Sequence, residues 1–376
     1  MNRSAASDGE LRVGLLSRGV YPRLVGGREV FIRGFAEALT RRGCEVVLVT
    51  ENGMGEPIPG VGEIALRTPE IEVIDLLAYS AAFARIALPG LRGVDVVHVH
   101  SPGANIVLGA WAARTLGVPL AVTVHSMAAA ESRWIWALRR AEAVVAVSPS
   151  VRERLVAGGV PTSRIRIIPS ASTAPTPTIR PAEIRARLGF RPEETVFIYN
   201  GRLVEGKGLM NLAEAFSSLR TPPARLIVLG EGPMRALMEN RLRACVAKET
   251  AVFVGRVKHE TVSSYLAAAD VAVLASESEG SPLALFEALA VGLPILATDV
   301  PGLRDFVEDG RDGTLVPRGD TVRLKDAMER LLADEGLRRR LSEGARRSAE
   351  RYTIEACAER HLELYRDLVR GRRSSA

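Results

Sequence analysis

The sequence predicts an α/β fold made of two doubly wound parallel-sheet domains that face each other across a cleft. The first observation is length, because 376 residues are more than one ordinary hydrophobic core supports. The second is the alternation of short runs rich in Val, Ile and Leu with helical stretches, which is typical of parallel sheets covered by helices on both faces. The third is a break in composition at residues 170–181 (SASTAPTPTIRP), which indicates an interdomain linker.

The part before the linker contains six apolar runs of strand length. These cover residues 11–17, 45–50, 94–101, 119–126, 143–148 and 165–169. Between the first two runs, residues 27–42 repeat apolar side chains with a helical period, and Gly43 follows as a stop signal. We therefore predict a first sheet domain over residues 1–170.

The part after the linker repeats this alternation. Its apolar runs cover residues 195–200, 225–229, 251–254, 271–276, 294–299 and 314–317. The tail, residues 321–373, is expected to be almost entirely helical. We predict a linker over residues 171–181, a second sheet domain over 182–352, and a C-terminal helix over 353–376 that packs back towards the first domain.

The balance of charge is positive, with 50 Lys and Arg against 44 Asp and Glu and a formal net charge of +6. A positive field favours phosphate-bearing partners. The cations are spread along the chain and aromatic residues make up only 5%, so a nucleic-acid-binding surface is disfavoured. A phosphate on a small molecule would use the same field, and peripheral association with an anionic membrane stays open.

The three cysteines, Cys44, Cys245 and Cys357, are far apart and form no Cys-x-x-Cys pair. This spacing indicates neither a disulfide framework nor a zinc site. The apolar runs are all far shorter than the roughly 18 residues that span a bilayer. We therefore expect a cytoplasmic protein.

Paired glycines, Gly26 and Gly27, follow the first predicted strand and precede a helix with Glu29 in its first turn. Such a pair lets the backbone approach an anion at a helix N-terminus. The pattern is not G-x-G-x-x-G, which weakens a dehydrogenase interpretation. A purely structural turn is the alternative.

A second glycine-containing loop, residues 201–208 (GRLVEGKG), follows the strand predicted at 195–200. Arg202 and Lys207 stand in this loop before a helix, so two cations and free backbone N–H groups converge where a diphosphate could bind. The loop is not a Walker A motif, because Gly208 stands where that motif requires a hydroxyl residue. A solvated charged turn is the alternative.

The most specific feature is the segment 279–287 (EGSPLALFE), in which a loop runs into a helix. Glu279 and Glu287 lie eight positions apart, about 12 Å if the segment were wholly helical. This distance roughly matches the span from a hexose to a ribose across a diphosphate, and carboxylates accept hydrogen bonds from vicinal hydroxyls. The N–H groups of Leu283 and Ala284 would face the phosphates. The alternative for Glu287 is a helix-surface carboxylate, although its apolar neighbours favour partial burial.

Two further groups are ambiguous. We place His98 and His100 on opposite faces of their predicted strand, and a buried, hydrogen-bonded role is favoured over contact with an acceptor. Trp134 and Trp136 follow the strand predicted at 119–126. A helix that covers the first core is favoured there over contact with an acceptor or a bilayer.

Taken in order, these motifs resemble the retaining glycosyltransferases of family 4, which have the GT-B fold of two Rossmann-like domains. The resemblance runs nearly end to end. Besides the three loops, it rests on Tyr21-Pro22, Asp95 with His98, His100 and Ser101, Thr123 to His125, Gly230-Glu231-Gly232-Pro233, Ala269-Asp270-Val271 and Gly292-Leu293-Pro294.

The resemblance implies an N-terminal acceptor domain and a C-terminal nucleotide-sugar domain. Arg202 and Lys207 would neutralise the donor diphosphate, Glu287 would hold the ribose hydroxyls, and Glu279 would bind the transferred sugar. His125 would lie beside the donor sugar and complete the catalytic set with Arg202, Lys207 and Glu279. The other donor-binding positions implied are Gly26, Gly27, Arg256, Gly280, Ser281, Leu283 and Ala284, with Arg256 stacking on the base.

The implied reaction transfers a hexose from a nucleoside diphosphate sugar with retention of configuration. UDP is the favoured nucleotide and N-acetylglucosamine the favoured sugar, while the acceptor, a small molecule, a glycan or a lipid-linked molecule, is not identified. We expect no cofactor and no metal ion, because the chain has no Asp-x-Asp motif. The alternatives are a GT-B sugar-nucleotide epimerase or phosphorylase, and a non-enzymatic basic protein that binds surfaces.

The sequence departs from the family pattern at two places. Pro169-Ser170-Ala171 stands where members commonly have Pro-Asn-Gly, the residues that best tolerate a left-handed turn. Asn200 stands before Gly201 where the family usually has an apolar residue. The sequence offers no explanation for Asn200.

Overall fold

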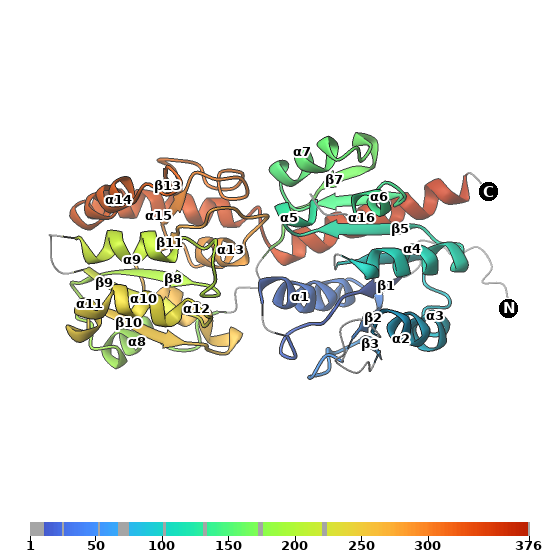
Figure 1. The fold of residues 1–376 in the computed structure, drawn as a ribbon, viewed down its shortest axis with the longest axis horizontal. Coiled ribbons are helices and arrows are strands. Elements are labelled where there is room, and N and C mark those ends of the chain that lie inside the picture. The colour runs from blue at the N-terminus through green and yellow to red at the C-terminus, as the bar shows by residue number, and fades with distance from the viewer. Residues whose placement is uncertain are drawn as a thin grey trace. The chain divides into compact units, whose positions relative to one another are not determined.

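The computed structural model describes residues 11–24, 26–51, 53–66, 75–100, 103–130, 134–171, 176–219 and 224–374. The chain forms two compact units (Figure 1). The first comprises residues 1–170 together with the C-terminal segment 354–376, and the second comprises residues 171–353. Each unit is built around one parallel sheet.

The sheet of the first unit has the strand order β3-β2-β1-β4-β5-β6-β7 in the described part of the chain, and all pairs are parallel. Its strands are β1 (Arg12–Leu16), β2 (Glu45–Thr50), β3 (Val61–Ala65), β4 (Val96–Val99), β5 (Leu120–Val124), β6 (Ala143–Ala146) and β7 (Ile165–Ile167). The order reverses between β1 and β4, which makes the carboxyl ends of these two strands a topological switch point. Strand β3 is missing from the sequence prediction, because this short edge strand is largely exposed and carries little apolar signal.

Helices complete the first unit. They are α1 (Gly27–Arg41), α2 (Asp75–Ala82), a π-helical turn (Phe83–Ala87), α3 (Leu88–Gly90), α4 (Ala104–Leu116), α5 (Met127–Ala130), α6 (Ile135–Leu138), α7 (Pro149–Ala157), a 3₁₀ turn (Thr162–Arg164) and α16 (Ile354–Arg373). Helix α16 packs on α1, where Arg41 pairs with Glu355 and Arg42 with Glu359, each at 3.1 Å. The last helix of the chain is therefore part of the first unit.

The two tryptophans lie at α6, where Trp134 is the N-cap and Trp136 is within the helix. Ala137 and Leu138 are buried, while Trp136 remains 45% exposed beneath the Arg140 guanidinium, which lies 5.1 Å from its ring. The favoured interpretation, a helix that covers the core, agrees with this placement. The neighbouring residues 131–133, Ser101 of the family pattern and residues 172–175 of the predicted linker lie outside the described residues.

The expectation that His98 and His100 lie on opposite faces is wrong. Residues two positions apart on a strand share a face, and the two ring centroids are 4.1 Å apart. Both side chains are fully buried, as the favoured interpretation requires. His98 bonds the hydroxyls of Tyr365 on α16, at 2.5 Å, and of Thr123 on β5, at 2.8 Å.

The sheet of the second unit has the order β10-β9-β8-β11-β12-β13, again with parallel pairs and a reversal, here between β8 and β11. The strands are β8 (Thr195–Asn200), β9 (Ala224–Leu229), β10 (Ala251–Gly255), β11 (Val271–Leu274), β12 (Ile295–Thr298) and β13 (Gly313–Val316). The helices are α8 (Pro181–Arg187), α9 (Leu209–Ser217), α10 (Arg235–Arg241), α11 (Arg243–Ala247), α12 (His259–Ala267), α13 (Leu283–Ala290), α14 (Thr321–Ala333) and α15 (Glu335–Ala349).

Helices cover both faces of this sheet, because apolar side chains point to both faces of its strands. Phe197 and Tyr199 of β8 join a core with α9 and α14, whereas Val196 and Ile198 join a second core with α12 and α13. Successive strand residues point to opposite faces, so both faces of β8 are apolar and buried. Within the described ranges, no helix has the length and apolarity needed to cross a membrane.

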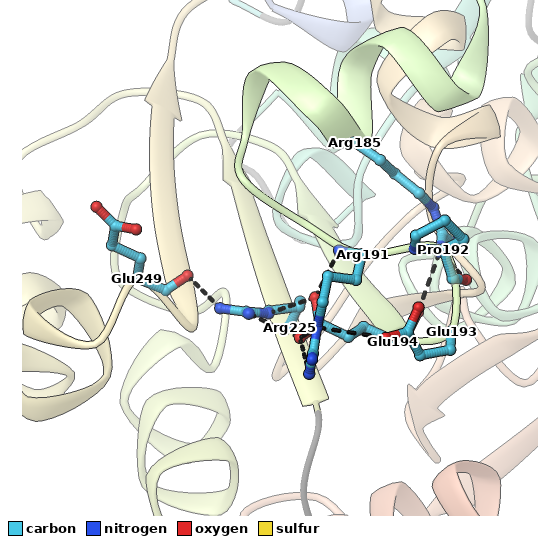
Figure 2. Close-up of polar contacts among 7 residues, drawn as sticks. All are labelled: Arg185, Arg191, Pro192, Glu193, Glu194, Arg225 and Glu249. Atoms are coloured by element: carbon cyan, nitrogen blue, oxygen red, sulfur yellow. Dashed lines mark hydrogen bonds and ion pairs between the residues drawn. The ribbon is translucent and has the colours of Figure 1, made fainter.

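A polar cluster fixes the amino ends of β8 and β9, opposite the edge where the switch point lies (Figure 2). The Glu194 carboxylate, 1% exposed, accepts two hydrogen bonds from Arg225 at 2.7 and 2.9 Å and one from the backbone N–H of Arg191 at 2.8 Å. Arg225 also donates to the carbonyl oxygen of Glu249 at 2.9 Å. This buried carboxylate is fully paired, so removal of one partner would leave a buried charge uncompensated and destabilise the fold.

Candidate donor-sugar site

The candidate site of the second unit is built by the loops after β8 and β11. These strands are parallel neighbours, so their carboxyl ends lie at the same edge of the sheet. The N–H of Glu277 donates to the carbonyl oxygen of Gly206 at 2.8 Å and ties the two loops together. Gly208 has φ +63°, and a Cβ there would lie 1.8 Å from the carbonyl oxygen of Ala275. Only glycine permits this close approach.

Lys207 and Glu279, one from each loop, form an ion pair with a Nζ to Oε1 distance of 2.5 Å. Their side chains are 25% and 12% exposed. The hydroxyl of Ser276 donates to the same Oε1 at 2.7 Å, and the backbone N–H of Glu279 donates to Pro301 at 3.2 Å. Glu279 is thus held in place from several sides, and its charge is compensated by Lys207.

Arg202 lies in the same loop and is exposed. Its carbonyl oxygen accepts a hydrogen bond from the Tyr199 hydroxyl at 2.8 Å, and the N–H of Leu203 donates to Glu231 at 2.9 Å. Among the described residues, no acceptor or carboxylate pairs with the Arg202 guanidinium. The backbone is therefore fixed while the cation stays available for a ligand.

Helix α13 begins at this edge with an uncapped N-terminus. Its N-cap residue, Pro282, supplies no side-chain hydrogen bond. The N–H groups of Leu283 and Ala284 have no acceptor within the described part of the chain, since intrahelical bonds cannot satisfy the first turn. Gly280 is buried and Ser281 is partly buried just before the helix. Open N–H groups beside Lys207 favour an anion at this position.

Glu287 lies inside α13 and is 5% exposed, so it is not a helix-surface carboxylate. Asn200, the last residue of β8, donates its side-chain N–H to Glu287 Oε2 at 2.8 Å. The other carboxylate oxygen lies 3.5 Å from Nδ1 of His259, the first residue of α12. Burial raises the pKa of Glu287 to about 7, and the hydrogen bond from Asn200 opposes this rise.

Arg256 is not brought into contact with these residues. It follows β10, which is separated from β8 by β9, and its side chain is exposed. No hydrogen bond or ion pair within the described ranges connects it to the other candidate positions.

The first unit carries the remaining candidates at the carboxyl ends of its strands. Gly26 is the N-cap of α1 and Gly27 its first residue. A Cβ on Gly26 would lie 2.4 Å from Oε2 of Glu29, a buried carboxylate that pairs with Arg28 at 2.6 Å. Gly26 therefore allows the first turn of α1 to close over Glu29.

His125 follows β5 and is half-buried. Its Nε2 lies 3.1 Å from Nδ1 of His100, and its ring packs edge-on against Phe31 of α1 at 5.7 Å between centroids. Burial, together with the nearby charge of Arg28, lowers the pKa of His125 to about 3. His125 is therefore neutral at physiological pH.

Three polar residues, Ser276, Asn200 and His100, were not connected with these candidates in the sequence analysis. Ser276 bonds Glu279, Asn200 bonds Glu287 and His100 bonds His125. A polar residue at the end of a buried strand is a usable signal, because it lies where parallel strands present ligands. Asn200 and His100 both stand at such positions.

Comparison with known protein families agrees with this geometry. The pattern of the family described as "Glycosyl transferases group 1" matches residues 181–348, and that of "Glycosyltransferase Family 4" matches residues 25–171. The D-inositol 3-phosphate glycosyltransferase of Acidothermus cellulolyticus is 30% identical over 397 residues, covering 93% of this chain and 88% of the relative.

Two further similarities extend over most of the chain. The 2-deoxystreptamine N-acetyl-D-glucosaminyltransferase of Streptomyces fradiae is 29% identical, covering 93% of this chain and 92% of the relative. The crystal structure of Anabaena HepE in complex with UDP-glucose shares the fold with a TM-score of 0.79 at 18% identity, covering 96% of this chain and 100% of that one. The predicted GT-B fold with two Rossmann-like α/β domains is confirmed. The chain belongs to glycosyltransferase family 4 and transfers a sugar from a nucleotide sugar.

Proposed function

We propose that this enzyme transfers a hexose, with N-acetylglucosamine as the favoured sugar, from its UDP-linked donor to an acceptor hydroxyl with retention and without a metal ion. The observation that carries the proposal is the Lys207–Glu279 pair at the carboxyl edge of β8 and β11, where the loop of Arg202 and the uncapped N-terminus of α13 also follow these two strands. Together these groups supply two cations and two N–H donors to a diphosphate, and one carboxylate to a sugar.

The chemistry requires stabilisation of the leaving group. When the bond between the anomeric carbon and the diphosphate oxygen breaks, the electron pair stays on the diphosphate. The acceptor oxygen then bonds to the anomeric carbon on the same face, and its proton passes to the departing diphosphate oxygen. Arg202 and Lys207 stabilise the developing negative charge. Lys207 is partly buried and held by Glu279, so it acts with little reorganisation, while the exposed Arg202 guanidinium adds a second positive charge. Glu279 accepts hydrogen bonds from hydroxyls of the transferred sugar.

The remaining candidates bind the donor. Glu287 accepts hydrogen bonds from the ribose hydroxyls, while Gly280 and Ser281 lie along the phosphates. In the first unit, the backbone of Gly26 and Gly27 and the neutral His125 side chain are the donor contacts that the family resemblance implies. Arg256 would stack on the base, and among the described residues no hydrogen bond or ion pair joins it to the other candidates.

The choice of UDP and of N-acetylglucosamine rests on relatives. HepE has been crystallised with UDP-glucose, and the relative from Streptomyces fradiae is named for transfer of N-acetyl-D-glucosamine. Both enzymes align over more than nine tenths of this chain.

A thermal-shift panel of UDP-, GDP-, ADP- and dTDP-sugars tests the donor. A ligand present at 100 times its Kd stabilises the folded state by about 2.7 kcal/mol, which raises the melting temperature by a few degrees. We expect the largest shift with UDP-N-acetylglucosamine, and a loss of this shift in Lys207→Ala but not in Lys248→Ala, a control on the exposed turn before β10. A larger shift with GDP-sugars would contradict the choice of nucleotide. Consumption of the donor without any acceptor would favour an epimerase.

A further inference from the structure

Asn200 carries a side-chain amide and follows four buried core residues of β8. The preceding residues 196–199 are at most 3% exposed and belong to the two cores of the second unit. Asn200 is the last residue of the strand, at the switch point between β8 and β11, and it is partly exposed. Because an amide at this partly exposed position contributes little to apolar packing, its main interaction is the polar contact of its side chain.

That contact is with Glu287, which lies 87 positions further along the chain. The Asn200 side-chain N–H donates to Glu287 Oε2 at 2.8 Å, the shortest polar contact of this carboxylate among the described residues. Oε1 faces His259 Nδ1 at 3.5 Å, beyond the usual range for a hydrogen bond. The orientation of the carboxylate is therefore set from the β8 side.

The surroundings of Glu287 offer little other support for its negative charge. Strands β11 and β12, which pack against α13, carry no ionisable side chain. Helix α12 contributes His259, whose pKa is lowered by burial, so it is neutral at neutral pH. Helix α15 contributes Arg346, which lies against Gly292 beyond the end of α13. A buried carboxylate without a cation at hydrogen-bond distance favours its protonated form.

We propose that Asn200 is a positioning residue that orients the Glu287 carboxylate and favours its ionised form, so that this carboxylate accepts hydrogen bonds from the nucleotide ribose. An amide N–H that donates to a carboxylate stabilises the ionised form, in which both oxygens act only as acceptors, whereas the protonated form presents an O–H donor on one oxygen. The proposal rests on the proposed ribose role of Glu287, and it explains the amide that replaces an apolar residue of the family.

The test measures the ionisation of Glu287 and the binding of UDP separately. The ionisation of Glu287 is followed by ¹³C NMR of carboxyl-labelled protein without nucleotide, with Glu287→Gln identifying the signal. UDP binding is measured by calorimetry between pH 6 and 9 on the same variants. Glu287→Gln retains the titration of the UDP phosphates and so gives the background of the pH profile.

Two variants of Asn200 test the amide. Asn200→Val restores an apolar residue and removes the donor, whereas Asn200→Asp keeps the shape and replaces the donor with an acceptor. We expect the Glu287 midpoint to rise by about one pH unit in Asn200→Val and by more in Asn200→Asp, with UDP Kd about tenfold higher at pH 7. A purely structural role predicts that the isosteric Asn200→Asp behaves like the wild type.

The outcomes are distinguishable. Unchanged Glu287 midpoints in both variants would overturn the role of Asn200, while the proposed function would stand as long as Glu287→Gln binds UDP more weakly than the wild type. Equal UDP affinity in the wild type and Glu287→Gln would overturn the ribose role and the inference that rests on it.

Discussion

At the scale of single residues, the two cations of the donor site differ in what they must give up to bind a diphosphate. Lys207 already has a counter-ion in Glu279, whereas Arg202 has no partner in the described part of the chain. Under the proposed function, a diphosphate would compete with Glu279 for Lys207 but not for Arg202. Displacement of Glu279 from Lys207 would then free this carboxylate for the transferred sugar.

Removal of either cation is expected to slow the reaction rather than unfold the protein. Lys207→Ala and Arg202→Ala should each lower kcat by about 10² to 10³, because each removes one preorganised stabiliser of the leaving group. Steady-state kinetics with the donor identified by thermal shift measures this effect. Lys248→Ala is the control, and near wild-type rates in both site variants would contradict the diphosphate assignment.

For Glu287, the folded state favours the protonated carboxyl group, whereas the proposed ribose role uses the ionised carboxylate. Burial raises its pKa from 4.5 to about 7, so its contribution to stability is fully present below pH 4.5 and is lost as pH rises through 7. The shift corresponds to about 3 kcal/mol. Glu287→Gln should therefore be more stable than the wild type at pH 8 and similar at pH 4.5. Urea unfolding at both pH values checks this, and a stability difference that does not change with pH would exclude the raised pKa.

At the scale of elements, the site depends on how closely the loop after β8 approaches β11. Gly208 lies where this approach is tightest, whereas Gly206, two positions earlier in the same loop, has a similar positive φ of +78° and nothing within 4 Å of a built Cβ. Substitution of Gly206 therefore tests backbone strain alone, whereas substitution of Gly208 adds a steric collision with Ala275.

Gly208→Ala should cost about 2 kcal/mol or more and displace Lys207, because its Cβ would collide with the carbonyl oxygen of Ala275. Gly206→Ala should cost about 1 kcal/mol, the strain of the left-handed backbone, and leave kcat close to that of the wild type. Thermal unfolding and kinetics of the pair measure both effects. Equal losses of activity would show that the close approach to Ala275 is unimportant.

At the scale of the whole molecule, the two units share one plan. In each, the strand order reverses once, between β1 and β4 or between β8 and β11, and the candidate residues follow strands at the carboxyl edge. In the second unit the opposite edge holds the Glu194 cluster of Figure 2, which is fully paired. Binding and structural charges are thus separated to opposite ends of the same sheet.

Because the Glu194 cluster lies away from the candidate site, we expect it to make the stability of the fold sensitive to acid, and we expect its removal to leave UDP binding unchanged. The hydrogen bonds from Arg225 lower the pKa of Glu194 from 4.5 to about 2, so its stabilisation is present above pH 4.5 and is lost as pH falls towards 2. Glu194→Gln should lose about 3 kcal/mol at pH 7 and little near pH 2, with UDP affinity unchanged. Urea unfolding across this range checks it against Glu193→Gln, whose side chain is 64% exposed. Equal stability of the two variants at pH 7 would refute this role.

Much of the fold could be predicted from the sequence, because buried parallel strands are nearly continuous apolar runs. Strand β8 was predicted with its observed bounds, whereas the half-exposed edge strand β3 was missed. For the site, the residues of the loops after β8 and β11 could be named in advance. Their partners could not, since nothing in the neighbourhood of Asn200 in the sequence points to a carboxylate 87 residues away.

The sequence by itself determined which segments form strands and helices, which loops carry glycines and cations, and which family the chain resembles. These properties follow from local periodicity and from residue types at short spacing. Only the tertiary structure decided that Lys207 meets Glu279, that Asn200 meets Glu287 and that His98 lies beside His100. The first two contacts join residues 72 and 87 positions apart, and they depend on the order of strands in the sheet, which local periodicity does not encode.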